Sequence, residues 1–353
     1  YLLKTGIAMS YTIKIQPSGH SFSVEAEEMI LEGALRQGIA FPYGCRSGVC
    51  GTCLGNVISG DLHYPDDIPM GMSEHDHEEG RALFCSAIAK SDMVIEMTEI
   101  AAAGEIDIKT LPVKVASLHK FAPDVMEVQL KLPVTERLQF LAGQYINILL
   151  PDGRKRAFSL ANAPYNDEYL ELQIRDVPGG KFTDDIFANV KEKDLLRIEG
   201  PLGTFFLRDD SGKPKILMGG GTGFAPLKGM IEQLISEGSQ DEVYLYWGVR
   251  SLVDLYRKDL AEKWAYQYEN IHFIPVLSEP QAEDKWQGRV GFVHDAVMAD
   301  FADLSDYEVY MSGPPIMVNA AVKAFKTIGL KEDSMFSDAF EYADDTLKAI
   351  AQA

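Results

Sequence analysis

The chain has 353 residues, of which 46% are hydrophobic and 24% are charged, and its formal net charge at pH 7 is −20. This composition is typical of a globular protein and excludes a disordered chain, while the length allows two or three domains. The negative charge argues against nucleic acid or an anionic membrane as a partner, because both attract cationic surfaces. The sequence contains no run of eighteen apolar residues and no secretory signal, so we expect a cytoplasmic protein.

The four cysteines follow a spacing that indicates an iron–sulfur cluster. Cys45, Cys50 and Cys53 are spaced CxxxxCxxC, and Cys85 follows later in the chain. A reducing compartment would not keep a disulfide framework, so metal or redox chemistry is expected. This is the plant-type spacing for a [2Fe–2S] cluster, whose two irons need four thiolates. A structural zinc site is the alternative, although only one CxxC pair is present.

The residues around the cysteines support the cluster interpretation. Gly44, Gly48 and Gly51 allow backbone amides to approach the sulfides, while Arg46 either screens the charge of the cluster or is simply solvated. The alternating patterns before the cysteines predict a β-hairpin, followed by a helix over 29–38 and a return strand over 54–64. Residues 10–99 therefore resemble a plant-type ferredoxin, which implies an α+β fold of the β-grasp type.

The next part of the chain predicts a small antiparallel barrel. Residues 100–110 are small and polar without a clear period, and are expected to form a linker. From residue 111 to 210, short alternating segments such as VKVASL, VMEVQLKL and LELQIRDV are separated by proline and glycine turns. This pattern is typical of an antiparallel β-barrel.

A motif in this barrel indicates a flavin site. Arg156, Phe158, Ser159 and Leu160 form RAFSL, which resembles the RxYSL marker of the flavin domain in the ferredoxin-NADP reductase superfamily. A guanidinium can hold a pyrophosphate through paired, charge-assisted hydrogen bonds. The resemblance further implies that the phenylalanine packs on the flavin and that the Ser159 hydroxyl reaches flavin N5, where hydride is accepted. The motif alone could also be an ordinary barrel strand.

A second segment of the barrel is expected to hold the phosphates of FAD. The sequence PGGKFT contributes backbone amides at the start of a predicted helix, a position that suits anions. A simple turn is the alternative interpretation. The candidate FAD-binding residues here are Gly179, Gly180, Lys181 and Thr183.

The last part, residues 211–353, alternates strand and helix and predicts an α/β, Rossmann-like domain. A buried strand, a glycine turn and an amphipathic helix follow one another over 213–238, where a dinucleotide could approach bare backbone at a helix N-terminus. The turn matches the motif GGGTGxAP of the nicotinamide domain in the same superfamily. The matching residues are Gly219, Gly220, Gly221, Thr222, Gly223 and Pro226.

Two further motifs complete the resemblance. In MSGPPIM, Ser312 stands where most relatives carry a cysteine near the nicotinamide, and Gly313 and Pro314 follow it. In FSDAF, the resemblance assigns Asp338 as the acidic residue and Phe340 as the aromatic that lies against the flavin ring. A core-packing phenylalanine at a strand end is the alternative. Ser159, Ser312 and Asp338 are thus the candidate catalytic residues.

The adenosine end of the nucleotide is less clearly marked. Gly248 and Arg250 follow the second predicted strand and are candidates for adenosine contact, while Asp254 could meet the ribose or start a helix. Beyond Arg250 there is no basic cluster for a 2′-phosphate. The sequence therefore favours NADH over NADPH.

The order ferredoxin, FAD barrel and nicotinamide domain resembles the reductase components of bacterial oxygenases, such as phenol hydroxylase, toluene or methane monooxygenase and benzoate dioxygenase. It also resembles CDP-6-deoxy-glucoseen reductases, which serve a sugar dehydratase. Flavin takes two electrons together and passes them on singly, so it can link NADH to a one-electron cluster. We expect a flavoprotein oxidoreductase that delivers electrons to an oxygenase component with a basic docking face. The alternatives are a free-flavin or quinone reductase and a non-enzymatic redox sensor.

Overall fold

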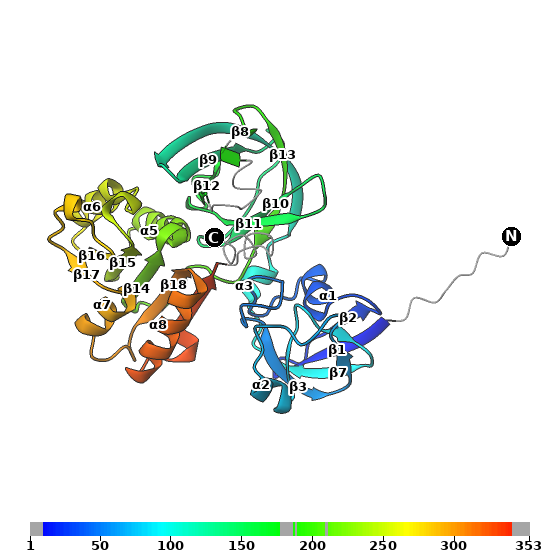
Figure 1. The fold of residues 1–353 in the computed structure, drawn as a ribbon. Coiled ribbons are helices and arrows are strands. Elements are labelled where there is room, and N and C mark those ends of the chain that lie inside the picture. The colour runs from blue at the N-terminus through cyan, green and yellow to red at the C-terminus, as the bar shows by residue number, and fades with distance from the viewer. Residues whose placement is uncertain (1–9, 177–185, 188, 209–210, 341–353) are drawn as a thin grey trace. The chain divides into compact units, whose positions relative to one another are not determined.

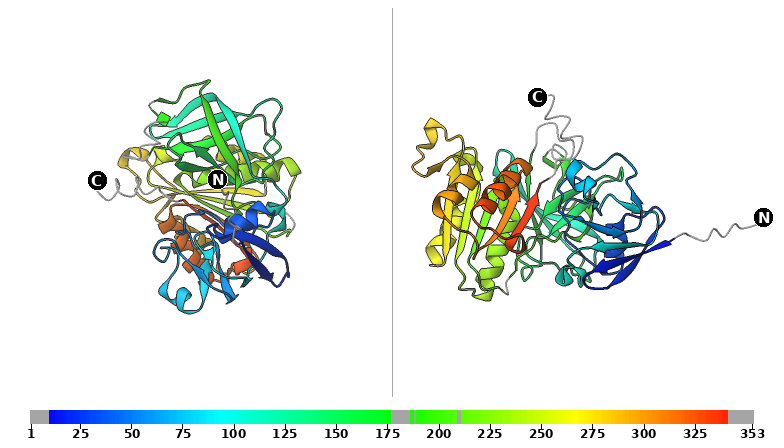
Figure 2. Two further views of the ribbon diagram at one scale, coloured as in Figure 1. Left: turned by 90° about the vertical axis from the view of Figure 1, so that its right-hand side faces the viewer. Right: turned by 90° about the horizontal axis from the view of Figure 1, so that it is seen from below.

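The computed structural model describes residues 10–176, 186–187, 189–208 and 211–340 (Figures 1 and 2). The chain divides into two compact units, of which the first ends at Asp107 and the second begins at Ile108. Within the described ranges, no helix combines the length and the apolar character needed to cross a membrane.

The first unit is a five-stranded mixed sheet packed against a helix. Its strand order is β2-β1-β7-β3-β5, with β1 and β2 forming the expected hairpin and β7 lying parallel to β1. Apolar side chains at alternate strand positions, such as Ile13 and Ile15, are fully buried beneath the helix residues Ile30 and Leu31. The bounds are β1 Ser10–Gln16, β2 Ser21–Glu25, α1 Ile30–Arg36, β3 Leu54–Ser59, β4 Leu62–His63, α2 Glu74–Glu78, β5 Arg81–Leu83, β6 Ile88–Ala89, β7 Met93–Glu96 and α3 Ala101–Gly104.

The segment interpreted as a linker from its composition is partly structured. Helix α3 forms one turn within it, and the first barrel strand already begins at Lys109. The amide of Ile100 donates to the carbonyl of Ala40 at 2.7 Å, so the turn is tied to the first unit. Alanines favour helix even in a short segment, and one turn is too short to show a helical period in the sequence.

The second unit begins with the predicted antiparallel barrel. Its strand order is β11-β10-β13-β8-β9-β12, and a bridge between Leu160 and Leu172 joins the two outer strands. Closing the sheet in this way removes its open edges. The bounds are β8 Lys109–Ala122, β9 Val125–Lys131, β10 Tyr145–Leu149, β11 Lys155–Ser159, β12 Leu170–Arg175 and β13 Leu195–Leu202.

The remainder of the second unit is an all-parallel sheet with helices on both faces (Figure 1). The strand order is β17-β16-β15-β14-β18-β19, so the direction of winding reverses between β14 and β18. Helices α5 and α6 pack on one face and α7 and α8 on the other. The strands are β14 Lys215–Gly220, β15 Val243–Val249, β16 Ile271–Leu277, β17 Arg289–Val290, β18 Glu308–Gly313 and β19 Met335–Ala339; the helices are α5 Phe224–Glu237, α6 Lys258–Gln267, α7 Val293–Asp300 and α8 Pro315–Thr327.

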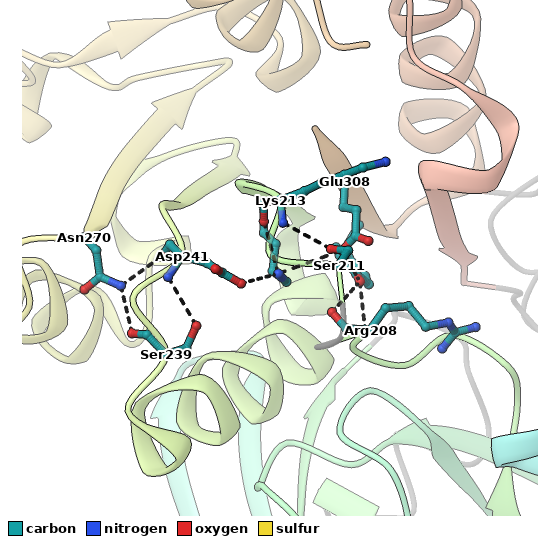
Figure 3. Close-up of polar contacts among 9 residues, drawn as sticks. Arg208, Ser211, Lys213, Ser239, Asp241, Asn270 and Glu308 are labelled. Carbon is teal, nitrogen blue, oxygen red and sulfur yellow. Dashed lines mark hydrogen bonds and ion pairs between the residues drawn. The ribbon is translucent and has the colours of Figure 1, made fainter. Parts of the chain in front are cut away.

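The amino-terminal edge of this sheet is closed by a buried ionic cluster (Figure 3). Lys215, at the start of β14, is fully buried; its ammonium lies 2.7 Å from the Asp241 carboxylate and 3.9 Å from that of Glu308. The Tyr310 hydroxyl donates to Glu308 at 3.1 Å and accepts from the backbone amide of Arg208 at 2.9 Å. This edge therefore ties the end of the barrel to the sheet.

Candidate cluster and flavin–nicotinamide sites

The four cysteine thiols converge in the first unit. The pKa of the Cys50 thiol is raised first by its contact with Cys45 and then by burial, and that of Cys85 is raised by contacts with Cys45 and Cys53. The amide of Cys85 also donates to the Cys53 sulfur at 3.4 Å. Contacts of this kind place the four predicted ligands within reach of one another.

The donor set fits a two-iron cluster. Among the described residues, no three His, Cys, Asp or Glu side chains surround the position of a single metal ion. A two-iron cluster takes two thiolates on each iron, which the four cysteines can supply. Backbone amides also point at sulfur, as when Ser47 donates to Cys45 at 3.3 Å.

Glycines and one ion pair shape the loop that carries the first three cysteines. Gly48 has a φ of +80°, and a Cβ there would lie 2.6 Å from the Ser86 hydroxyl, so only glycine fits. The Arg46 side chain is only 13% exposed, and its guanidinium binds the carboxylate of Glu32 on α1 at 2.5–2.9 Å. This pair fastens the thiol loop to the helix.

The flavin motif lies on β11 and its exit from the barrel. Arg156, Phe158 and Ser159 belong to the strand itself and are partly exposed, which leaves them accessible to a ligand. Leu160 is fully buried in the barrel core and its amide donates to the carbonyl of Gln144 at 2.9 Å, so its side chain serves packing. The candidates Gly179, Gly180, Lys181 and Thr183 lie outside the described residues.

The nicotinamide motifs meet at the carboxyl ends of β14 and β18, where the strand order reverses. Ligands of open parallel sheets bind at such a point. A Cβ on Gly223 would lie 2.0 Å from the Ser312 carbonyl oxygen, and one on Gly220 would lie 3.0 Å from Pro314. The two motifs therefore touch, and only glycine permits this approach.

Several groups at this point suit a dinucleotide. Among the described residues, no side chain caps the N-terminus of α5, but the Phe224 amide donates to the carbonyls of Gly221 and Thr222 and Pro226 has no amide proton, so the glycine turn is the part of the backbone that remains for a phosphate. Thr222 lies in the turn itself, and the buried Pro226 lies in the first turn of α5. The missing amide proton of a proline costs no helix hydrogen bond at that position. Ser312 is fully buried, and its hydroxyl has no hydrogen-bond partner within the described structure. A buried hydroxyl of this kind at a ligand crevice fits a polar group of a bound molecule.

The last strand brings the remaining candidates to the same place. Ser159 donates to the Asp338 carboxylate at 3.4 Å, although the two residues are 179 positions apart. Asp338 is also the register partner of Ser312 across β18 and β19. The amide of Phe340 donates to the Gly313 carbonyl at 2.8 Å and keeps the strand end against β18.

Two of the candidates for adenosine contact, Gly248 and Asp254, also have roles in packing and capping within the fold. A Cβ on Gly248 would lie 2.6 Å from the Val293 side chain, so glycine is needed there for α7 to pack. Asp254 is buried, accepts from the Ser251 amide at 3.1 Å and pairs with Arg175 of the barrel at 3.0 Å, so it caps the short turn Leu252–Asp254. Arg250 is exposed and lines a cavity of about 350 Å³.

Comparison with known proteins agrees with this arrangement. Three family models match the chain: "2Fe-2S iron-sulfur cluster binding domain" over residues 13–90, "Oxidoreductase FAD-binding domain" over 112–207 and "Oxidoreductase NAD-binding domain" over 217–323. The CDP-6-deoxy-L-threo-D-glycero-4-hexulose-3-dehydrase reductase of Yersinia pestis is 40% identical over 94% of this chain and 99% of its own length.

Reductases of oxygenase systems are similar to a comparable extent. The reductase component DmpP of phenol 2-monooxygenase from a Pseudomonas species is 35% identical over 96% of both chains. A solved structure described as the ferredoxin reductase in carbazole 1,9a-dioxygenase superposes with a TM-score of 0.71 at 28% identity, covering 95% of this chain and 100% of the other.

Proposed function

The chain belongs to the ferredoxin-NADP reductase superfamily, in the group that joins a plant-type ferredoxin to FAD- and NAD-binding domains, and from this we propose that it passes electrons from NADH to a separate oxygenase component. The protein is an iron–sulfur flavoprotein oxidoreductase. Within the proposal, its domains span 10–99, 111–210 and 211–353, with 100–110 as the linker. The contact between Ser159 and Asp338, beside the buried hydroxyl of Ser312, carries the proposal.

The roles of the site residues follow from their positions. Arg156 would bind the pyrophosphate of FAD, and Gly219–Gly223 with the N-terminus of α5 would bind the phosphates of the nicotinamide nucleotide. When bound, FAD accepts the two electrons of a hydride together and releases them one at a time, as a one-electron cluster requires. Asp338 accepts a hydrogen bond from the Ser159 hydroxyl and so orients the serine lone pairs, while Ser312 would offer its hydroxyl to the nicotinamide.

A preference for NADH is supported by the charges of the cavity beside Arg250. Asp124, Asp254 and Glu279 line this cavity, which follows the carboxyl ends of β15 and β16. The nearby Arg175 is already bound to Asp124 at 2.8 Å as well as to Asp254. A 2′-phosphate would meet these carboxylates, whereas a ribose hydroxyl could donate to them.

The NADH preference can be tested by reversing one charge. Glu279→Lys should raise the kcat/KM ratio of NADPH to NADH by about tenfold, because it replaces a repelling charge by an attracting one. Glu269→Lys makes the same charge change at an exposed residue outside the cavity and should leave the ratio unchanged. Equal ratios in both variants would place the 2′-phosphate elsewhere.

The electron exit can be tested by removing one thiol. In Cys50→Ser, reduction of the one-electron acceptor cytochrome c should fall by more than about tenfold, because electrons then lack the cluster, while ferricyanide reduction by the flavin persists. Iron content and visible absorbance report the loss of the cluster. Equal loss of both activities would instead favour a general folding defect, and no loss would favour the flavin reductase alternative.

The docking face of the acceptor is proposed to lie beside the thiol loop. The segment 66–71 lies against this loop, since the amide of Gly71 donates to the Gly48 carbonyl at 2.9 Å. It presents Met70, which is 79% exposed, next to the exposed acidic pair Asp66 and Asp67. An acceptor with basic side chains around an apolar centre would fit this face. Turnover with the acceptor should fall as salt rises and lose that dependence in an Asp66→Asn, Asp67→Asn double variant.

A sugar 3-dehydrase is the second candidate acceptor, favoured by the 40% identical Yersinia relative. NADH consumption coupled to a purified dehydrase, compared with coupling to a purified oxygenase component, distinguishes the two. The acceptor that raises NADH consumption and forms its own product is the partner class.

A further inference from the structure

Helix α5 carries a buried lysine that reaches across to the barrel. Lys228 is 4% exposed, and its ammonium donates to the Ala161 carbonyl at 3.0 Å and to the Glu171 carboxylate at 2.9 Å. A third contact, to Glu232 one turn along the same helix, is 2.8 Å long. Three acceptors thus match the three protons of the ammonium, which is the condition for burying such a charge.

The acceptors on the barrel side belong to the strand ends that form the flavin site. Ala161 follows the RAFSL motif directly, so its carbonyl lies two residues beyond Ser159. Glu171 is on β12, and its amide donates to the Asn162 side chain at 2.9 Å. The barrel segment that Lys228 contacts is therefore held in place by its own hydrogen bond between Glu171 and Asn162.

The helix side of the contact begins at the nicotinamide turn. Lys228 lies in the second turn of α5, which starts directly after Gly223. A Cβ on the next residue, Gly229, would lie 2.9 Å from the Asn162 carbonyl oxygen, so the helix and the barrel segment approach at backbone distance. One ammonium thus connects the helix behind the glycine turn to the strand end behind Ser159.

A separate contact holds the two halves of the second unit at the adenosine side. Arg175 binds Asp254, and the Tyr256 hydroxyl donates to Gln173 at 2.7 Å. If the Lys228 contact were lost, these bonds would still hold the halves together. The nicotinamide end of the crevice would then be free to shift relative to Ser159.

We propose that Lys228 is a positioning residue for hydride transfer, which fixes the nicotinamide-binding turn relative to the flavin-binding strand. The inference rests on the proposed function and adds to it a residue that touches neither reactant. Hydride transfer depends steeply on the separation of donor and acceptor, and a misplacement of about 1 Å costs roughly a hundredfold in rate. Lys228 therefore acts on rate through geometry and not through binding.

Lys215 provides a matched control for the purely structural alternative. It is also a fully buried lysine, and it binds Asp241, Glu308 and the Lys213 carbonyl. All of these partners belong to residues 211–353, at the opposite edge of the sheet. Loss of Lys215 leaves the bond between Tyr310 and the Arg208 amide in place, so it should weaken the fold without moving the nicotinamide turn against the barrel.

The test compares Lys228→Met, Lys228→Arg and Lys215→Met in the full-length protein loaded with FAD and cluster. At saturating NADH, the flavin reduction rate of Lys228→Met should fall by about ten- to a hundredfold, with a change in apparent Kd of less than about threefold. Lys228→Arg, which keeps the charge, should recover part of the rate. Lys215→Met should lower Tm and keep the rate within about twofold.

Hydrogen–deuterium exchange gives a readout that does not depend on turnover. Peptides covering 160–171 and 224–234 should exchange faster in Lys228→Met than in Lys215→Met. If Lys228→Met does not retain FAD, Glu171→Gln keeps the other two contacts and should still lower the limiting rate.

A normal limiting rate in the Lys228 variants, or in Glu171→Gln where that variant is needed, overturns the inference. Equal rate losses in Lys228→Met and Lys215→Met also overturn it. Failure of the unchanged protein to reduce its flavin with NADH would instead contradict the proposed function.

Discussion

The two edges of the parallel sheet are built in opposite ways. At the carboxyl edge, Gly220, Gly223 and Gly313 bring strand ends together, and the Ser312 hydroxyl is buried without a partner in the described structure. At the amino edge, the buried Lys215 ammonium pairs with the carboxylates of Asp241 and Glu308, both of which Figure 3 labels. The same strands run through both edges, so the difference lies in the side chains at their ends.

Because of this difference, we expect the carboxyl edge to serve the reaction and the amino edge to serve the stability of the fold. Unpaired polar groups and bare backbone cost folding free energy unless a ligand satisfies them, whereas a satisfied ionic cluster is costly to disrupt. Substitutions at the carboxyl edge are therefore expected to change hydride transfer more than stability. Substitutions at the amino edge are expected to do the reverse.

The largest effect is expected from Gly223→Ala. The new Cβ would lie 2.0 Å from the Ser312 carbonyl oxygen, so the glycine turn must move away from β18. We expect flavin reduction by NADH to slow by about a hundredfold, measured in single turnover. Gly212→Ala, with a φ of +62° and open space around it, is the control and should react at nearly the rate of the unchanged protein. Similar rates in the two variants would contradict the close approach of the motifs.

At the amino edge, Glu308→Gln tests the opposite expectation. Replacing the carboxylate weakens its contacts with Lys215 and with the Tyr310 hydroxyl, and should cost about 1–3 kcal/mol of the free energy of unfolding. Denaturant unfolding measures this cost. The rate of flavin reduction should not change; a slower rate at unchanged stability would break the separation of the two edges.

Asp338→Asn should lower the rate without lowering stability. The amide is a weaker acceptor than the carboxylate for the Ser159 hydroxyl, so orientation of that hydroxyl is lost in part. Flavin reduction should slow by about tenfold at unchanged Tm. Asp303→Asn, an exposed aspartate that accepts from the Ser305 amide, is a control expected to leave the rate unchanged.

The smallest effect concerns Glu127, a partly buried carboxylate on β9. Burial and then the charge of Glu171 raise its pKa, despite the attraction of Arg257, Lys228 and His119. A raised pKa means that the folded state disfavours the charged form of Glu127. With respect to this group, the folded protein is therefore most stable below the pKa that Glu127 has in the unfolded chain, and it loses stability as the pH rises through the pKa that Glu127 has in the folded protein. Glu127→Gln should therefore raise Tm at pH 7, and the gain should shrink toward pH 4. A gain that is constant with pH would point to packing instead.

The sequence was most informative where chemistry is local. The close spacing of Cys45, Cys50 and Cys53 indicates the cluster without knowledge of the fold, and the comparisons support a cluster-binding domain there. The glycine turn and RAFSL similarly identify the nicotinamide and flavin halves. In each of these motifs, the residue types and spacing of a short segment are enough to indicate the cofactor.

Sequence reasoning failed where a partner comes from a distant segment. Lys228 has the pattern of a solvent-facing lysine on an amphipathic helix, and only the fold shows that Glu171 and Ala161 bury it. Gly248 stays a candidate for adenosine contact, and the fold adds that its lack of a side chain makes room for Val293. The sequence signal at this place is Gly229 in the interior of the helix, since a glycine there often marks a close approach.

Anaerobic stopped-flow absorbance after mixing with NADH and then NADPH tests the order of electron transfer. We expect rapid loss of flavin absorbance, then slower loss of the visible cluster band, with NADH faster than NADPH. A flavin that is reduced while the cluster band never changes would contradict the account, because the thiol-bound cluster would then lie outside the electron path.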